Sequence, residues 1–200
     1  YLVARLFPLF AISGNVLEIV MNVGTITMLF AAIIACTQKD IKRILAYSTL
    51  SQLGYMMLAL GSAKLIDGSV HTLGYTAATF HIFTHAFFKC KLFLIAGALI
   101  HQVHTNDLEA MGGLRKKMPW TYAASLIACL AIAGIPPFSG FYSKDEILIT
   151  AYQAGHPIIF ACALFTSFLT AFYMFRLFFL AFHGKMRSAP KHPVHESLLM

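Results

Sequence analysis

Four protonatable side chains lie within one apolar stretch, Phe80–Lys91 (FHIFTHAFFKCK). His81, His85 and Lys89 are spaced four residues apart, which places them on one face of an α-helix, roughly 6 Å apart along its axis. Protonatable groups inside a membrane helix are costly and are functional by default. The spacing predicts a proton-transfer column, called here the His–Lys column. Structural hydrogen bonding between helices is the alternative. Lys91 points about 200° away from Lys89 and lies outside the column.

The chemistry of the column follows from the membrane around it. A charged lysine at the centre of a bilayer is costly, and burial favours its uncharged form. The proton affinity of Lys89 would therefore respond to a charge that moves nearby, as a proton pump requires. Histidine titrates near neutral pH, so His81 and His85 can pass protons along the column. The gaps exceed one hydrogen bond, so bridging water molecules are required.

Further charged side chains occur in the apolar segments that follow. Lys144 is a second candidate for the proton pathway, and Asp145 is a possible charge partner for it. Glu146 could take the same role, or both acids could face a neighbouring subunit. Arg176 stays protonated in proteins, so we expect a fixed charge that pairs with an acid.

The composition is that of an integral membrane protein. Hydrophobic residues make up 58% of the 200 residues and charged residues 12%, whereas soluble domains have about 45–50% and about 25%. No basic arm with interleaved aromatic residues indicates nucleic-acid binding. The sequence also has no nucleotide-binding loop, metal-ligand set, nucleophile triad or C-x-x-C pair. We therefore expect transport, with no cofactor and no metal bound by this chain.

The hydropathy pattern predicts an all-α membrane protein with five complete transmembrane helices. A spanning helix needs about 20 apolar residues, and the expected spans are 15–36, 44–61, 73–101, 119–154 and 157–182. Residues 1–12 are expected to be the end of a preceding, truncated transmembrane helix, and residues 184–200 a polar tail. The chain begins at Tyr1, within apolar sequence and without a signal peptide, so we expect a fragment of a longer protein.

The fourth span is discontinuous, with an expected break at residues 135–140. Pro136 and Pro137 remove backbone donors, and Gly140 loosens the turn. Broken backbone at membrane depth needs protein or water to satisfy it, and discontinuous helices that carry charges indicate ion sites. Lys144 lies just beyond the break. Two short helices joined by a loop are the alternative, although neither half alone would span the bilayer.

Two further patterns constrain how the helices are arranged. Polar residues at three- and four-residue spacings in the second span predict a stripe that faces protein or water and not lipid. This polar stripe consists of Ser48, Ser51, Gln52 and Tyr55. If the spans alternate in direction, only Lys64 lies in the opposite loops, and the other loop cations share one side, which is then cytoplasmic or matrix-facing. These cations are Lys39, Lys42, Arg43, Arg115, Lys116, Lys117, Lys185, Arg187 and Lys191.

Several segments closely resemble the antiporter-like membrane subunits of proton-pumping NADH:quinone oxidoreductase, respiratory complex I. They are Asp40–Gly61 (DIKRILAYSTLSQLGYMMLALG), Phe80–Lys89 (FHIFTHAFFK), Met111–Pro119 (MGGLRKKMP) and Gly140–Leu148 (GFYSKDEIL). The SKDEIL run and Phe182–Lys185 (FHGK) are most similar to the chain 5, or L-type, members. The resemblance covers nearly all of the chain between residues 15 and 185.

The resemblance implies an antiporter-like repeat of five helices at residues 13–183, the second of two inverted repeats. It implies that Lys89 is the central proton-carrying residue and that Lys144 leads to the exit side. His81 and His85 would link Lys89 toward the first repeat. The family usually has a small or apolar residue where Lys91 stands, and a second lysine so close would repel the charged form of Lys89.

The resemblance also implies a function and its partners. The expected function is proton translocation, coupled to electron transfer from NADH to quinone elsewhere in the complex. NADH, FMN, iron–sulfur clusters and quinone would be used by other parts of the complex. The expected location is the inner membrane of a bacterium, in preference to that of a mitochondrion. The expected partners are other membrane subunits of the complex, including a neighbouring antiporter-like subunit. The alternatives are the large subunit of a multi-subunit Na⁺/H⁺ antiporter and the membrane subunit of a membrane-bound hydrogenase. A purely structural scaffold would not need the buried charges.

Overall fold

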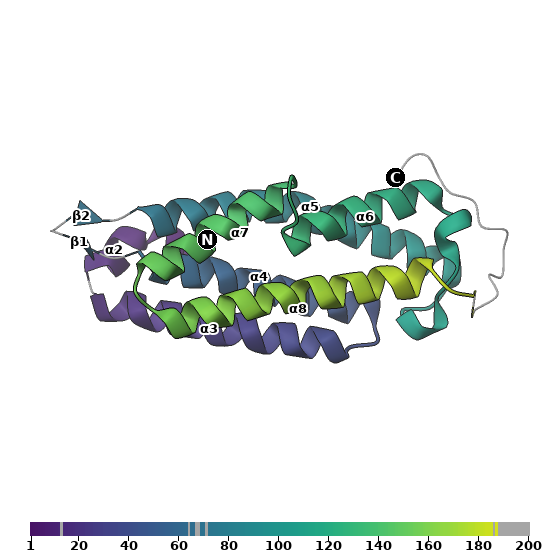
Figure 1. Ribbon diagram of the computed structural model, residues 1–200, viewed down its shortest axis with the longest axis horizontal. Helices are drawn as coiled ribbons and strands as arrows, with labels where there is room; N and C mark the ends of the chain where they lie inside the picture. The colour runs from purple at the N-terminus through teal and green to yellow at the C-terminus, as the bar shows by residue number, and fades with distance from the viewer. Residues whose placement is uncertain (13, 64, 67–68, 71, 186, 188–200) are drawn as a thin grey trace.

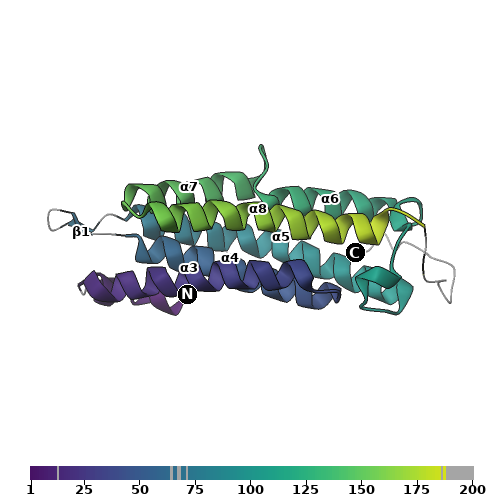
Figure 2. The same cartoon turned by 60° about the horizontal axis from the view of Figure 1, so that its bottom comes forward.

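The computed structural model describes residues 1–12, 14–63, 65–66, 69–70, 72–185 and 187. Within these residues, six helices of at least 15 residues run along the longest axis of the molecule, side by side except for α6 and α7, which follow each other end to end (Figures 1 and 2). They are α3 (Gly14–Thr37), α4 (Ile41–Gly61), α5 (Leu73–Val103), α6 (Pro119–Ala133), α7 (Ser139–Gln153) and α8 (Pro157–Phe182). The shorter elements are α1 (Leu2–Arg5), α2 (Phe7–Ile12), the 3-10 turns η1 (Leu108–Ala110) and η2 (Leu114–Lys116), and strands β1 (Leu65–Ile66) and β2 (Ser69–Val70).

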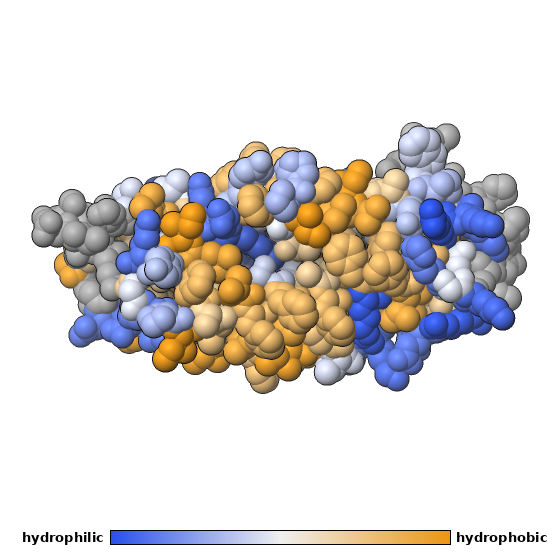
Figure 3. All heavy atoms as spheres, in the orientation of Figure 1, coloured by the Kyte–Doolittle hydropathy of each residue, from blue (hydrophilic) through white to orange (hydrophobic). Residues whose placement is uncertain are grey.

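The all-α membrane class is confirmed, since the only strands within the described residues are the two-residue β1 and β2. In this part of the chain, α4, α5, α8 and Asn15–Thr37 of α3 are long and apolar enough to cross a membrane. On the face that Figure 3 shows, hydrophobic side chains cover most of the middle, and hydrophilic ones gather mainly toward the ends. Large apolar side chains such as Phe30, Phe87 and Phe168 are more than half exposed, as expected for groups that face lipid.

The start of α4 differs from the expected span at 44–61, because α4 begins three residues earlier. Asp40 caps the helix, and its carboxylate accepts hydrogen bonds from the backbone N–H groups of Lys42 and Arg43. Such a cap satisfies donors that the first helical turn leaves without partners. The two basic residues therefore belong to the first turn of α4 and not to the connection before it.

The predicted break in the fourth span lies between α6 and α7, which are arranged end to end (Figures 1 and 2). It begins at Gly134, one residue before the expected range, because Gly134 ends α6 in the left-handed conformation (φ 80°). A residue without a Cβ adopts this conformation readily. Ser139 and Gly140, expected in the break, already form the first turn of α7.

Helices α3 and α4 pack closely because glycines remove side chains where the two backbones meet. A Cβ added to Gly24 would lie 2.6 Å from the backbone nitrogen of Leu58, and one added to Gly54 would lie 2.6 Å from that of Met28. Small residues at such contacts let membrane helices approach each other. This contact fixes α4, and with it the polar stripe, against α3.

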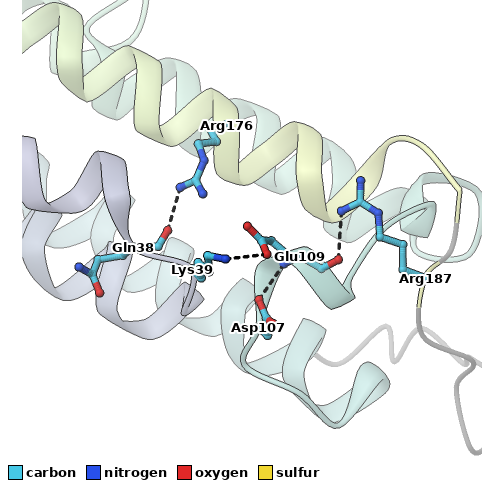
Figure 4. A network of polar contacts seen from close by, with 6 residues as sticks. All are labelled: Gln38, Lys39, Asp107, Glu109, Arg176 and Arg187. Carbon is cyan, nitrogen blue, oxygen red and sulfur yellow. Dashed lines mark hydrogen bonds and ion pairs between the residues drawn. The ribbon is translucent and has the colours of Figure 1, made fainter.

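The predicted basic connections meet at one end of the bundle. The backbone N–H of Ile41 donates to the carbonyl of Asn106, and that of Gly113 donates to the carbonyl of His183. Side chains reinforce this end: Lys39 pairs with Glu109 at 3.0 Å, and Arg187 donates to the carbonyl of Glu109 (Figure 4). The described cations thus lie together as the alternating topology predicts. Lys64 and Lys191 lie outside the described residues.

The ends of the chain do not test the predicted division into a preceding helix, a repeat and a tail. Residues 1–12 form α1 and α2, interrupted at Leu6. Of the expected polar tail, only Gly184, Lys185 and Arg187 are described. The division at residues 12, 13 and 183 therefore stays a prediction.

Candidate functional site

Helix α5 carries the His–Lys column into the interior of the bundle. His81, His85 and Lys89 lie on its buried face, with exposed fractions of 0%, 9% and 5%. The ring centroids of His81 and His85 are 6.2 Å apart. Within the described part of the chain, Nε2 of His85 and Nζ of Lys89 have no hydrogen-bond partner. Two buried polar atoms of the column are therefore free to bind water or a proton.

His81 is held by side chains from two neighbouring helices. Its Nδ1 lies 2.8 Å from Oγ of Ser143 on α7, and its Nε2 lies 3.1 Å from Oε1 of Gln52 on α4. The hydroxyl of Thr84, one turn further along α5, lies 3.0 Å from the same Ser143 oxygen. The hydrogen bonds of the His81 ring thus join α5 to α4 and α7, and neither of them goes to His85 on α5 itself.

The polar stripe on α4 faces protein, as predicted, because all four of its residues are fully buried. Ser51 donates to the carbonyl of Met28, and Tyr55 donates to the carbonyl of Ala163 at 2.6 Å. Ser48 accepts a hydrogen bond from Tyr173 on α8. Helix α4 therefore lies at the centre of the bundle, where its polar groups bind α3, α5 and α8.

Lys144 is buried next to the break between α6 and α7. Its ammonium group donates a 2.6 Å hydrogen bond to the carbonyl oxygen of Ile132, in the last turn of α6. The same nitrogen lies 5.5 Å from the centre of the Tyr55 ring. A cation is favoured at a helix C-terminus, where backbone carbonyls lack partners, and over an aromatic face.

The structure does not bring Lys144 together with Asp145, its possible charge partner. Lys144 points into the bundle, whereas Asp145 and Glu146 are exposed. Successive helical residues differ by about 100° in direction, so neighbours in sequence face different surroundings. The described residues do contain an ion pair, between Lys39 and Glu109. A backbone carbonyl, and not a carboxylate, binds the Lys144 ammonium.

Arg176 also contacts backbone carbonyl groups, where an acidic side chain was expected as its partner. Its Nη1 donates to the carbonyls of Cys36 and Gln38 at 3.2 and 2.8 Å, and Figure 4 shows the contact with Gln38. These carbonyls lie at the end of α3, where helical acceptors have no partner within the helix. Arg176 thus ties α8 to the C-terminal end of α3.

Lys91 is half-buried on a different side of α5 from the column. Lys89, in contrast, is buried with its nitrogen 5.8 Å from the centre of the Phe93 ring. The separation of the two lysines agrees with their angular spacing on the helix.

The sequence did not single out three hydroxyl residues of the site, because single hydroxyl residues in membrane helices give no pattern by themselves. They are Ser143, Thr84 and Tyr173. The one available signal was the position of Ser143 directly before Lys144.

Comparisons with known proteins identify the architecture. The sequence pattern of the family described as "NADH:quinone oxidoreductase/Mrp antiporter, TM" matches residues 1–170. NAD(P)H-quinone oxidoreductase subunit 5 of Paulinella chromatophora is 48% identical over 94% of this chain and 28% of its own length. NADH-quinone oxidoreductase subunit L of Rickettsia bellii is 49% identical over 94% of this chain and 27% of its own length.

A solved structure gives the same result. A chain of the Mrp complex from Dietzia sp. DQ12-45-1b superposes with a TM-score of 0.81 at 30% identity, over 90% of this chain and 32% of that one. This chain therefore spans less than a third of the length of the relatives named here.

Proposed function

Because this chain belongs to the NADH:quinone oxidoreductase/Mrp antiporter family of transmembrane proteins, we propose that it translocates protons as part of an NADH:quinone oxidoreductase. The observation that carries the proposal is the His–Lys column, which is buried and ends in a lysine nitrogen without a protein partner. The chain is about 45–49% identical to L-type and chain 5 subunits of that enzyme.

The proposed mechanism uses Lys89 as a site with two proton states. No carboxylate pairs with its nitrogen within the described residues, so its charge depends on weaker contacts such as the Phe93 ring and on any water that enters. Without a fixed counter-charge, the preference between ammonium and amine depends on charges that appear nearby. Lys89 then takes up a proton in one state of the site and releases it in the other.

Lys144 supplies the second site in this mechanism. As an ammonium it stays on the Ile132 carbonyl at the end of α6, and as an amine it still has hydrogens to donate. The exchange between Lys89 and Lys144 needs bridging water, because no direct contact between the two is found in the described residues. His85, with Nε2 free, lies one turn from Lys89 and can bind such a water.

We infer that this chain performs the proton transfer and not the redox step. NADH, FMN, iron–sulfur clusters and quinone would act elsewhere in the complex. The exposed apolar side chains of α3, α5 and α8 fit contact with lipid and with other membrane subunits, among them a neighbouring antiporter-like subunit. A bacterial inner membrane is the proposed location, in line with the L-type relatives from Rickettsia and Neisseria.

A Na⁺/H⁺ antiporter subunit is the second candidate, supported by the superposition on the Mrp complex. The two functions differ in their energy source and in their ion. We would place the full-length protein and its complex in sealed vesicles and follow internal acidification after NADH addition, with and without Na⁺. The redox function predicts acidification that needs NADH and quinone but not Na⁺. Acidification that needs a Na⁺ gradient and ignores NADH would support the antiporter instead.

The role of the histidines is tested in the same vesicles. The double change His81→Ala with His85→Ala should lower proton transport several-fold while the amount of assembled complex stays the same. Loss of assembly in proportion to the loss of transport would contradict a proton-transfer role and favour a structural one.

A further inference from the structure

His81 is the one column residue whose two ring nitrogens both have protein partners in the described residues. Nδ1 faces Ser143 on α7 at 2.8 Å, and Nε2 faces Gln52 on α4 at 3.1 Å. The ring is fully buried. It is held from opposite edges by different helices, so it cannot turn over without breaking both contacts.

The Gln52 contact determines which ring nitrogen carries a fixed hydrogen. In the structure Gln52 Oε1, which only accepts hydrogen bonds, lies toward the ring, while Gln52 Nε2 has no hydrogen-bond partner in the described residues; in this arrangement His81 Nε2 donates. In the neutral ring Nδ1 is then an acceptor, and the Ser143 hydroxyl donates to it. In the imidazolium form Nδ1 donates, and Ser143 must accept. Any proton that His81 gains or loses is therefore exchanged at Nδ1, on the α7 side.

Thr84 supplies what this reversal requires. Its Oγ1 lies 3.0 Å from Ser143 Oγ and 3.2 Å from the backbone carbonyl oxygen of His81. With a neutral ring, Thr84 donates to Ser143, and Ser143 donates to Nδ1. With a charged ring, Nδ1 donates to Ser143, Ser143 donates to Thr84, and Thr84 donates to the His81 carbonyl. Every hydroxyl hydrogen has an acceptor in both arrangements, which matters because a buried donor without a partner is costly.

We propose that Thr84 and Ser143 form a reversible hydroxyl relay that delivers a proton to Nδ1 of His81 and removes it again. Gln52 is the positioning residue that keeps the other nitrogen, Nε2, protonated. A hydrated proton that reaches Thr84 Oγ1 displaces the Thr84 hydrogen to Ser143 and the Ser143 hydrogen to Nδ1. One proton enters and one positive charge appears on the ring. The bonds between heavy atoms do not change, and the hydroxyls finish in the reversed arrangement.

This inference rests on the proposed proton translocation and refines it. In this mechanism His81 gains and loses its proton at the same nitrogen, Nδ1, beside the broken helix. A proton does not enter the ring at one nitrogen and leave it at the other. The titratable groups that face His81 are His85 on α5, Lys144 on α7 and Tyr55 on α4, whose ring centroid lies 6.5 Å away. Since like charges repel, loading of His81 is opposed while Lys144 is charged. The two sites should therefore be charged alternately.

The test is the titration of His81 itself in the full-length protein. We would label the histidines with ¹⁵N, embed the protein in bilayers, and assign the His81 ring by the signals that disappear in His81→Gln. The Thr84→Val variant keeps the side-chain shape but removes the relay hydroxyl, whereas Thr84→Ser keeps the hydroxyl. Thr166→Val is the matched control, because Thr166 is also a buried threonine and its hydroxyl bonds to the Cys162 carbonyl of its own helix.

We expect His81 to titrate alike in the wild type, Thr84→Ser and Thr166→Val, with Nε2 protonated throughout. In Thr84→Val its proton affinity should fall about tenfold or more, equivalent to about one pH unit. Gln52→Glu should raise the affinity by a similar factor, because a carboxylate stabilises the imidazolium. An unchanged titration in Thr84→Val, or a neutral ring protonated at Nδ1, would overturn the proposal.

A second pair keeps the test informative if Thr84→Val does not fold. Ser143→Ala should lower the proton affinity of His81, and Ser143→Thr, which retains a hydroxyl, should restore it. The ¹⁵N signals report the ring and not transport. If the protein carries no protons across the membrane, the proposed function is refuted. The ¹⁵N titration of His81 still decides whether the relay exists.

Discussion

The ammonium nitrogen of Lys144 lies 2.6 Å from the carbonyl oxygen of Ile132, so a side chain of α7 caps the C-terminal end of α6 across the break between the two helices. The break itself leaves acceptors without helical partners, which cannot be left unsatisfied inside a membrane. One residue thus has two roles: it stabilises the discontinuous helix and places a titratable group where the helix is broken. A change in its charge therefore alters the contact that joins the two halves.

Removal of the Lys144 ammonium should destabilise the break. Lys144→Met keeps the aliphatic part but leaves the Ile132 carbonyl without its donor, at a cost of about 1–3 kcal/mol. We expect a lower thermal unfolding midpoint of the full-length subunit in detergent. Lys91→Met is the matched control, because Lys91 is half-buried in the same bundle. Equal midpoints for the two variants would contradict the role of Lys144 at the end of α6.

The close contact of α3 with α4 predicts opposite effects for two glycine changes. Gly54→Ala places a Cβ 2.6 Å from the backbone nitrogen of Met28, and such overpacking typically costs about 1–3 kcal/mol. Gly97→Ala on α5 meets no atom within 4 Å, so it should be neutral or slightly stabilising. The folded fraction after mild heating in detergent measures both. A well-tolerated Gly54→Ala would mean that the two helices are further apart than described.

Arg176 should matter for assembly of the bundle and not for proton transfer. Arg176→Leu removes the donor to the carbonyls of Cys36 and Gln38, and a hydrogen bond to a charged group contributes about 1.5–3 kcal/mol. We expect a lower yield of assembled complex. The complex that does assemble should pump normally per NADH oxidised. A pumping defect at normal yield would place Arg176 in the proton pathway and contradict its structural role.

The basic end of the bundle should depend on the Asp40 cap of α4 more than on its surface ion pair, Lys39 with Glu109, which Figure 4 shows. Asp40→Ala removes the cap of α4 and should cost about 0.5–2 kcal/mol. Glu109→Gln breaks the exposed pair with Lys39 and should cost less than about 1 kcal/mol. Chemical denaturation of the full-length subunit ranks the two variants. The reverse order would show that the ion pair is stronger than its exposure indicates.

Much of the architecture was predictable because the membrane imposes a length on each helix. The structure has α5 at Leu73–Val103 where residues 73–101 were expected, and α8 at the expected residues 157–182. The differences occur where local chemistry determines the end of a helix. Asp40 starts α4 early, His104 ends α5 in the left-handed conformation, and Gly134 ends α6. Hydropathy does not register such caps.

The candidate site was predictable only along single helices. The four-residue spacing of His81, His85 and Lys89 identifies one face of α5, and burial agrees with that face. The partners of His81 come from residues 29 and 62 positions away, and helix packing alone brings them together. The contact of Lys144 with the Ile132 carbonyl could not be predicted, because a backbone carbonyl that accepts a charged donor has no signature in the sequence.

The measurement that tests the central claim most directly is the number of protons transported per NADH oxidised by Lys89→Ala in the complete complex, in sealed vesicles. Lys91→Ala is the matched control, since it removes a lysine of the same helix that lies outside the column. The account predicts a large loss of transported protons in Lys89→Ala at a normal level of assembled complex, with Lys91→Ala close to wild type. An unchanged proton yield in Lys89→Ala would contradict it.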